Sequence, residues 1–382
     1  MADKKQASRR SSGGLKSSTS TKQSVRSKVK AASSKPLSEE AQAAIDDVVD
    51  EVDDLQEQAT FSYKIDQAAE LDSEIPGLAD QVADLRRRGY TYKSYLEQKV
   101  ETLAAKWEAA RPAFERELRK AERSLSDDVD ALTDRLIEVQ RRGDLRAIQA
   151  LGTEVSSVES AIEAAENAID AAYENVYRAF QQTRSQINGV AWTLDELEQA
   201  TFELLQGESV IEAVDAHWWR DGKKDGPQGV LYLTDQRLIF EQKEKVATKK
   251  VLFIATEKEL VQEMVFEAPV MSIQSVKGES KGFLKGEDHL DFEFGSGAPY
   301  AVGHFHIKGD ESEMWVSLIK RVKNGQIRAE SVAGDEEGHA VAQEDTIGEA
   351  PERCVSTGAP IGLLAQGQRQ VTCEFCGPSM RW

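Results

Sequence analysis

The chain has 382 residues, of which 30% are charged and 7% aromatic, and its formal net charge is −19. This length accommodates two or three domains, and the composition is typical of a long solvated helical region attached to a smaller globular part. The acidity excludes general nucleic-acid binding by the chain as a whole, because it would repel a phosphate backbone. No run of apolar residues approaches the roughly 20 positions that a membrane-spanning helix needs, and the first residues lack the apolar core of a signal peptide. We therefore expect a cytoplasmic protein whose contact with any membrane is peripheral.

The beginning of the chain differs in charge from the rest. Residues 1–37 hold ten Lys and Arg against the single acid Asp3, a net charge of +9, so the remaining chain must carry −28 to give the total of −19. Large apolar residues are almost absent, and such a segment cannot offset the entropy lost on ordering, which predicts a disordered basic tail. The tail could attract anionic lipid, bind nucleic acid or simply keep the chain soluble. We expect no specific nucleic-acid partner.

Residues 38–205 are predicted to be helical. Apolar residues recur at alternating spacings of three and four positions in the runs 45–59, 96–139 and 148–176. This spacing places one apolar stripe along each helix, as in a coiled coil. Pro76 and Gly77 are expected to end the first helix, and Pro112 is expected to kink or interrupt the second.

The segment Arg141-Arg142-Gly143-Asp144 separates the two long apolar runs. It predicts the tip of an antiparallel helical hairpin. Because many stripe positions are alanines that bury little area each, we expect a further helix or a second chain to complete the packing. The favoured interpretation is a stalk that forms homo-oligomers. The hairpin is also similar in general shape to the membrane-remodelling phage-shock and ESCRT-III proteins, and that alternative stays open.

Residues 206–325 are richer in aromatic and β-branched residues, in short runs bounded by glycine that predict strands. Gly229–Phe240 reads GVLYLTDQRLIF, two apolar strands around a polar turn, and follows Trp218 and Trp219. The last part, Asp310–Val322, places its apolar residues on one helical face. The hairpin and this final helix closely resemble GRAM domains, which are pleckstrin-homology-like. The resemblance implies a mainly β domain that docks on membranes or on partner proteins.

The resemblance also implies that loops bind the ligand. The basic residues of the first loop, before the hairpin, and those that follow the hairpin could form a rim for phosphate headgroups; they are Arg220, Lys223, Lys224, Lys243, Lys245, Lys249 and Lys250. Acidic residues are interleaved among them, which is also typical of an ordinary solvated loop. An anionic membrane surface and a protein therefore both remain candidate partners.

After an acidic linker over 326–351, residues 352–382 contain all three cysteines of the chain, Cys354, Cys373 and Cys376. Their spacing resembles a zinc ribbon, in which two Cys-x-x-Cys-Gly knuckles hold one structural zinc ion. Thr357 stands where the fourth cysteine belongs, so the missing ligand could be His339, water or a group from another chain. The alternative is a degenerate ribbon that has lost its metal.

Catalytic patterns are scarce. The sequence has no Walker A or HExxH motif. His304 and His306 would share one side of a strand and could bind metal, although such pairs usually do not. The sequence thus predicts a multidomain, non-enzymatic scaffold or adaptor: an all-α stalk, then a mainly β GRAM-like domain, then a small zinc-ribbon-like tail. A soluble assembly factor without membrane contact and a membrane-remodelling hairpin remain the alternatives.

Overall fold

A computed structural model describes two compact units in this chain. It covers residues 24–32, 37–219, 226–251, 254–281, 287–332, 370–372 and 379–381, with the backbone alone for 246–251, 254–258, 281, 287, 370–372 and 379–381. The first unit contains the chain up to Gly77 together with Glu101–Gln181, and the second contains Leu78–Val100 and the chain from Gln182 onward. No helix among the described residues is long and apolar enough to cross a membrane.

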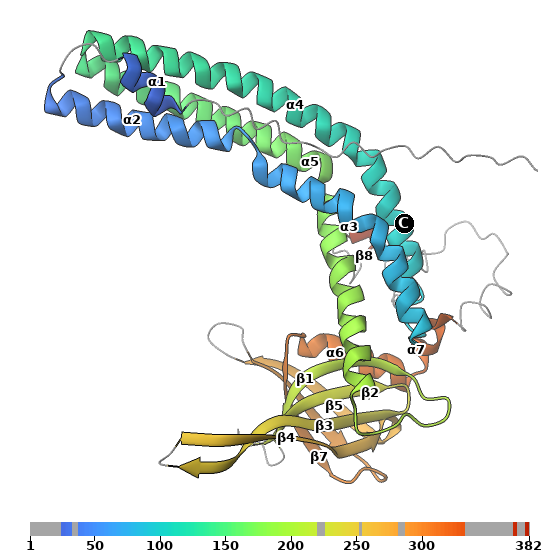
Figure 1. Cartoon of the computed structure of the whole chain (residues 1–382). Helices are drawn as coiled ribbons and strands as arrows, with labels where there is room; N and C mark the ends of the chain where they lie inside the picture. The colour runs from blue at the N-terminus through green and yellow to red at the C-terminus, as the bar shows by residue number, and fades with distance from the viewer. Residues whose placement is uncertain are drawn as a thin grey trace, which may run out of the picture. The chain divides into compact units, whose positions relative to one another are not determined.

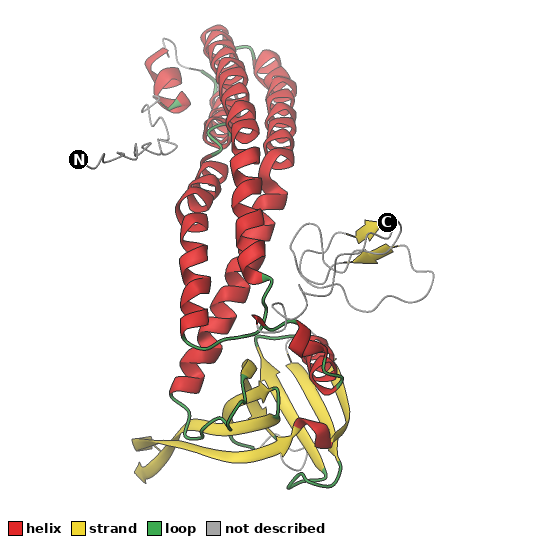
Figure 2. Cartoon of the chain, turned by 90° about the vertical axis from the view of Figure 1, so that its right-hand side faces the viewer, coloured by secondary structure: helices red, strands yellow, loops and turns green. Residues whose placement is uncertain are grey.

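The region that the sequence predicts as helical is helical (Figure 1). Its helices are α1 Val25–Ala32, α2 Glu39–Gln58, α3 Ser62–Arg87, α4 Leu96–Arg142 and α5 Leu145–Glu198. Most residues of the predicted stripes are buried, among them Ile45, Leu55, Phe114, Leu136 and Ile169. The predicted hairpin tip is also found, because the Gly143 amide closes the end of α4 on the carbonyl oxygens of Val139 and Gln140. Beyond this turn α4 and α5 lie side by side in the first unit (Figure 2).

Two details of the helices differ from the prediction. Pro76 does not end a helix: it lies inside α3, where Leu71, Ile75, Leu78 and Val82 on both sides of it are buried. Their burial outweighs the hydrogen bond that a proline removes. The chain breaks earlier instead, at Phe61, whose φ of 49° ends the regular helix.

The second proline and part of the basic tail also lie in helices. Pro112 also lies inside a continuous helix, α4. Part of the range predicted as a disordered tail is helical, because α1 spans Val25–Ala32 and buries Val25 and Val29. The residues before Ser24 lie outside the described part of the chain.

The second unit contains an antiparallel sheet of seven strands in the order β4-β3-β2-β1-β7-β6-β5. The strands are β1 Val210–Trp218, β2 Gln228–Thr234, β3 Arg237–Val251, β4 Ile254–Pro269, β5 Ile273–Lys281, β6 Glu287–Phe294 and β7 Val302–Lys308. A short 3-10 turn, Val270–Ser272, joins β4 to β5, and α6 Ser312–Lys323 and α7 Gln326–Ala329 follow β7. Farther on, β8 Gln370–Thr372 pairs with β9 Ser379–Arg381.

An aromatic core lies inside the curved sheet. Trp218 packs against Phe240, Phe266 and Phe305 with ring centroids 5.6–6.3 Å apart, and Trp315 of α6 is fully buried. These two tryptophans are core residues, as the sequence predicts. The β3–β4 hairpin is longer than predicted: its pairing continues to Val251 and Ile254, so that its end projects beyond the rest of the sheet (Figure 1).

A buried ion pair closes the hairpin Gly229–Phe240. The Arg237 guanidinium donates to Glu208 at 2.7 and 2.9 Å, to Glu267 at 2.6 Å and to the Glu203 carbonyl at 3.0 Å. Glu208 also accepts from the Leu205 amide at 2.7 Å and from the Thr234 hydroxyl at 2.6 Å. Burial acts to raise the pKa of the Glu208 carboxyl, but these donors outweigh it and lower the pKa. Arg237 thus closes the hairpin through the carboxylates of Glu208 and Glu267 and the carbonyl of Glu203.

Replacing Glu208 by alanine should lower the free energy of unfolding by about 3 kcal/mol, because Arg237 and the Leu205 amide then lose a buried partner. Chemical denaturation of the full chain, followed by tryptophan fluorescence, measures this loss. The control Glu203→Ala removes an exposed carboxylate nearby and should change the free energy by less than about 0.5 kcal/mol. Equal effects of the two substitutions would contradict the assigned role.

Candidate docking site

The ends of the long helices cover part of the outer face of the sheet. The Tyr90 hydroxyl donates to the Ile211 carbonyl at 3.1 Å, and the Thr193 hydroxyl accepts from the Ala213 amide at 3.2 Å. The Tyr232 hydroxyl donates to the Glu196 carbonyl at 3.2 Å. Tyr90 thus fixes the segment after α3 on β1, and the other two contacts fix the last turns of α5 on β1 and β2.

An ion pair lies among these contacts. The Lys93 ammonium is 2.8 Å from the Glu212 carboxylate, and the two side chains are 18% and 10% exposed. Burial acts to lower the pKa of Lys93, but Glu212 outweighs it and raises the pKa. Arg86 supports the same connection by donating to the carbonyls of Tyr90, Tyr92 and Lys93 at 2.7–3.0 Å. The Lys93 ammonium is therefore held in place against Glu212.

A cavity of about 380 Å³ opens beside the end of α5. It lies where β3 leaves β2: the two strands pair as far as Gln242, after which β3 continues paired with β4 alone. We call this cavity the sheet groove; its walls are Glu196, Asp215, Ala216, Gln228, Gly229, Val230, Lys243, Glu244, Lys245, Leu260 and Lys308. Leu260, opposite Lys245 in the hairpin, is 52% exposed, so the groove has an apolar rim.

The charges of the sheet groove are balanced. Its three lysines face three carboxylates, and one pair is closed, with the Lys243 ammonium 2.6 Å from Glu196. Burial and then Glu196 raise the pKa of the Asp215 carboxyl, against the opposing effect of Lys308 and Lys243. A cavity that contains both signs of charge and an apolar rim offers hydrogen-bond donors, acceptors and an apolar contact together. This combination matches a polypeptide better than a phosphate group.

Two of the predicted ligand residues, Lys243 and Lys245, belong to the sheet groove. Lys249 and Lys250 lie farther along β3, where only the backbone is described, opposite Glu257 and Ala255. The other predicted ligands lie outside the described residues: Arg220, Lys223, Lys224 and the cysteines Cys354, Cys373 and Cys376.

The sequence prediction missed Glu196, Asp215, Leu260 and Lys308. They come from four separate elements, α5, β1, β4 and β7, and only strand pairing brings them together. The one sequence signal for Asp215 is that it is a carboxylate within a largely apolar strand.

Four histidines form a second cluster on the outer face of the sheet. The strand register aligns His217 of β1, His306 of β7 and His289 of β6 in one row, with neighbouring ring centroids 5.9 and 5.0 Å apart. Next to this row, His304 pairs with Asp291 and stacks on Trp219 at 5.2 Å. Among the residues that the structure describes, no three His, Cys, Asp or Glu side chains are arranged to hold a metal ion.

The histidine row should make the second unit less stable in mild acid. Burial, then Lys308 and His306, lower the pKa of His217 below its usual value of 6.5, against a weaker opposing effect of Glu244. The unfolded chain therefore binds more protons than the folded chain as the pH falls below about 6.5, so the stability decreases there.

Thermal unfolding between about pH 7.5 and 5.5 tests this effect of the row. His217→Gln should reduce the fall in Tm on acidification, since glutamine keeps a polar group beside Gln228 on β2 without a titrating charge. An unchanged slope in this variant would show that the row does not sense pH.

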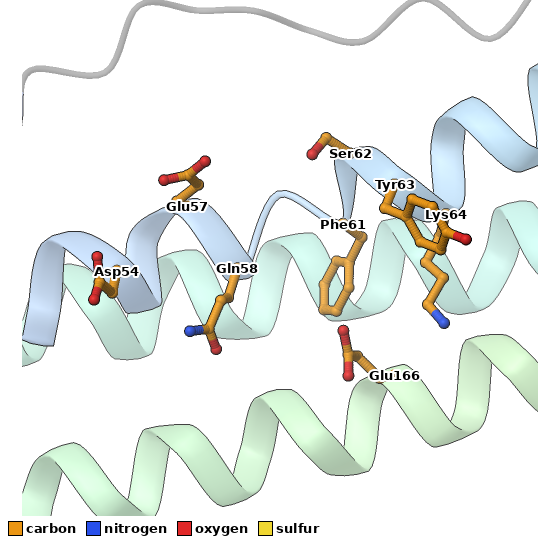
Figure 3. A pocket seen from close by; sticks show the side chains of 8 residues that line it. All are labelled: Asp54, Glu57, Gln58, Phe61, Ser62, Tyr63, Lys64 and Glu166. Carbon is orange, nitrogen blue, oxygen red and sulfur yellow. The ribbon is translucent and has the colours of Figure 1, made fainter. Parts of the chain in front are cut away.

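The first unit contains another cavity, of about 330 Å³, at the junction of α2 and α3 (Figure 3). Its walls are Asp54, Glu57, Gln58, Phe61, Ser62, Tyr63, Lys64 and Glu166. The Lys64 ammonium is paired with Asp170 at 2.7 Å, while Tyr63 is 68% exposed. The carboxylates give this cavity an acidic character.

Comparison with known proteins identifies one domain. Residues 196–283 match the GRAM domain family. The match begins in the last turn of α5, at the groove residue Glu196, and includes the hairpin Gly229–Phe240. Together with the antiparallel strands closed by α6, it confirms the GRAM, pleckstrin-homology-like domain that the sequence predicts. No curated protein matches the chain.

Some solved structures are distantly similar. One is the Vps36 N-terminal PH domain, at 16% identity and a TM-score of 0.22, with 32% of this chain and 85% of that chain covered. Another is the DH/PH domains of p115-RhoGEF, at 14% identity and a TM-score of 0.21, with 68% and 80% covered. A third is the complex of PDZ-RhoGEF DH/PH domains with activated RhoA, at 12% identity and a TM-score of 0.21, with 78% and 86% covered. Likeness at this level carries no argument about this chain.

Proposed function

We propose that the chain is a non-enzymatic adaptor whose GRAM-like domain docks an extended segment of a partner protein in the sheet groove. The observation that carries this proposal is the balanced charge of the groove beside the exposed Leu260. A phosphate headgroup would require an excess of donors, whereas Lys243 is already paired with Glu196. A polypeptide presents both signs of charge, backbone hydrogen-bonding groups and apolar side chains.

The helical region would then act as the scaffold. Long helices with buried apolar stripes commonly serve as spacers and as oligomerisation surfaces. We propose that the α4–α5 hairpin holds copies of the chain together and displays the docking domain.

A peripheral membrane contact is the second candidate function. It is favoured by the basic charge of residues 1–37, since each lysine or arginine near an anionic surface adds about 1 kcal/mol of attraction. This contact would use the basic segment rather than the sheet groove.

A photo-crosslinking amino acid at position 260 tests the groove. In cells that express the full chain, it should yield protein adducts that the same probe at Met271, 73% exposed on the turn between β4 and β5, does not yield. With the identified partner purified, Leu260→Asp combined with Lys245→Glu should weaken binding about tenfold or more, while Met271→Asp should not. Adducts with lipid alone at position 260, or equal effects of both variants, would refute protein docking in the groove.

We also propose that Cys354, Cys373 and Cys376 hold one structural zinc ion. Cys373 and Cys376 stand between β8 and β9, which pair as a hairpin, as the knuckle of a zinc ribbon would require. The purified full chain should contain about one zinc per chain by elemental analysis, and Cys373→Ser should lose it.

The vacant ligand position provides a sharper test of the zinc proposal. Thr357→Cys should tighten zinc binding because it completes a four-cysteine set. The control Ser356→Cys places the new thiol one position away and should not. A metal-free native chain would refute the proposal.

A further inference from the structure

Helix α1 attaches the basic beginning of the chain to acidic helices of the same unit. Val25 and Val29 are buried, 0% and 4% exposed, and α1 lies next to α2 (Figure 1). The charged contacts join opposite charges: Arg26 pairs with Asp50 of α2, and the Lys28 ammonium is 3.1 Å from Asp130 of α4.

The beginning of α1 is capped by another helix. The Asp53 carboxylate accepts from the Val25 amide at 2.7 Å and from the Arg26 amide at 3.3 Å. These are the amides that a helix cannot satisfy internally, and the positive end of the helix dipole favours a carboxylate there. The three acids Asp50, Asp53 and Asp130 therefore form a seat for α1, and we call them the α1 seat.

The contact is suited to being released. A helix of eight residues is too short to be stable alone, so α1 depends on its two buried valines and on surface ion pairs. Arg26 and Asp50 are 59% and 64% exposed, and such pairs weaken as salt screens them.

The start of α1 lies close to acidic side chains of α2. Lys22 lies two positions before Ser24, and the amide of Val25 is bound at Asp53. The next residues along α2, Asp54 and Glu57, line the acidic cavity of the first unit (Figure 3). The described part of the chain therefore begins beside acidic side chains of the same unit.

We propose that α1 is an autoinhibitory clip. While it is docked on the α1 seat, Arg26 and Lys28 stay paired with the acidic helices, and their charge is withheld from anionic surfaces. Competition by an anionic membrane, or loss of the seat, frees α1 and these two cations. This inference deepens the second candidate function and is independent of protein docking in the sheet groove.

Matched variants of the full chain test the clip. The seat variant combines Asp50→Asn, Asp53→Asn and Asp130→Asn, and leaves the basic segment unchanged. The control combines Asp46→Asn, Asp47→Asn and Asp134→Asn, which changes the net charge equally at exposed positions of the same two helices. A second pair acts from the α1 side: Val25→Asp with Val29→Asp, against Ser27→Asp with Ala31→Asp on its exposed face.

Hydrogen exchange gives the first readout. The α1 amides 27–32 should be protected in the native chain and in both controls, and unprotected in the seat variant and in the valine variant. No protection in the native chain, or equal protection in the seat variant and its control, would overturn the docking.

Cosedimentation with vesicles gives the second readout, using phosphatidylcholine that contains about one third phosphatidylserine, at about 0.1 M salt. The seat variant should bind about tenfold more tightly than its control, because the charges of at least Arg26 and Lys28 become available. An equal gain in both would mean that only net charge matters and would overturn the clip. If the seat variant frees α1 but does not bind, autoinhibition is wrong, whereas the crosslinking result at the sheet groove is unaffected.

Discussion

The buried ion pair between Lys93 and Glu212 joins the segment between α3 and α4 to β1, and the candidate docking site depends on this connection. Removing one partner would leave the other charge uncompensated under the helix ends, which typically costs several kcal/mol. Around this pair, the hydroxyls of Tyr90 and Thr193 contact the backbone of β1. Because these contacts fix the end of α5, Glu196 can form one wall of the sheet groove. The sheet groove is therefore built jointly by a helix and a sheet.

Charge is used differently in the two units. In the second unit, Arg237 with Glu208 and Lys93 with Glu212 are closed pairs that fix structure. In the first unit, the pair Arg26–Asp50 is largely exposed and contributes little to stability. Exposed pairs of this kind suit a reversible contact.

The sequence was informative where one local pattern determines the structure. The three-and-four spacing of apolar residues correctly predicts the long helices, Gly143 marks their turn, and GVLYLTDQRLIF identifies the GRAM-like hairpin. It misled at Pro76, because proline propensity is local while the burial of Leu71 and Leu78 that overrides it is tertiary. The sheet groove was half predicted: Lys243 and Lys245 follow the hairpin directly, but Lys308 reaches the groove only through the pairing of β7 with β1.

The most direct test of a groove built jointly by helix and sheet is native-state hydrogen exchange on the full chain over a range of denaturant. If α5 and the sheet form one cooperative body, the amides of residues 190–198 and of β1 should converge on the same opening free energy with the same dependence on denaturant. If residues 190–198 instead exchange by a separate, weakly denaturant-dependent opening while β1 stays protected, the wall at Glu196 is not fixed. A preformed docking groove at that position would then be contradicted.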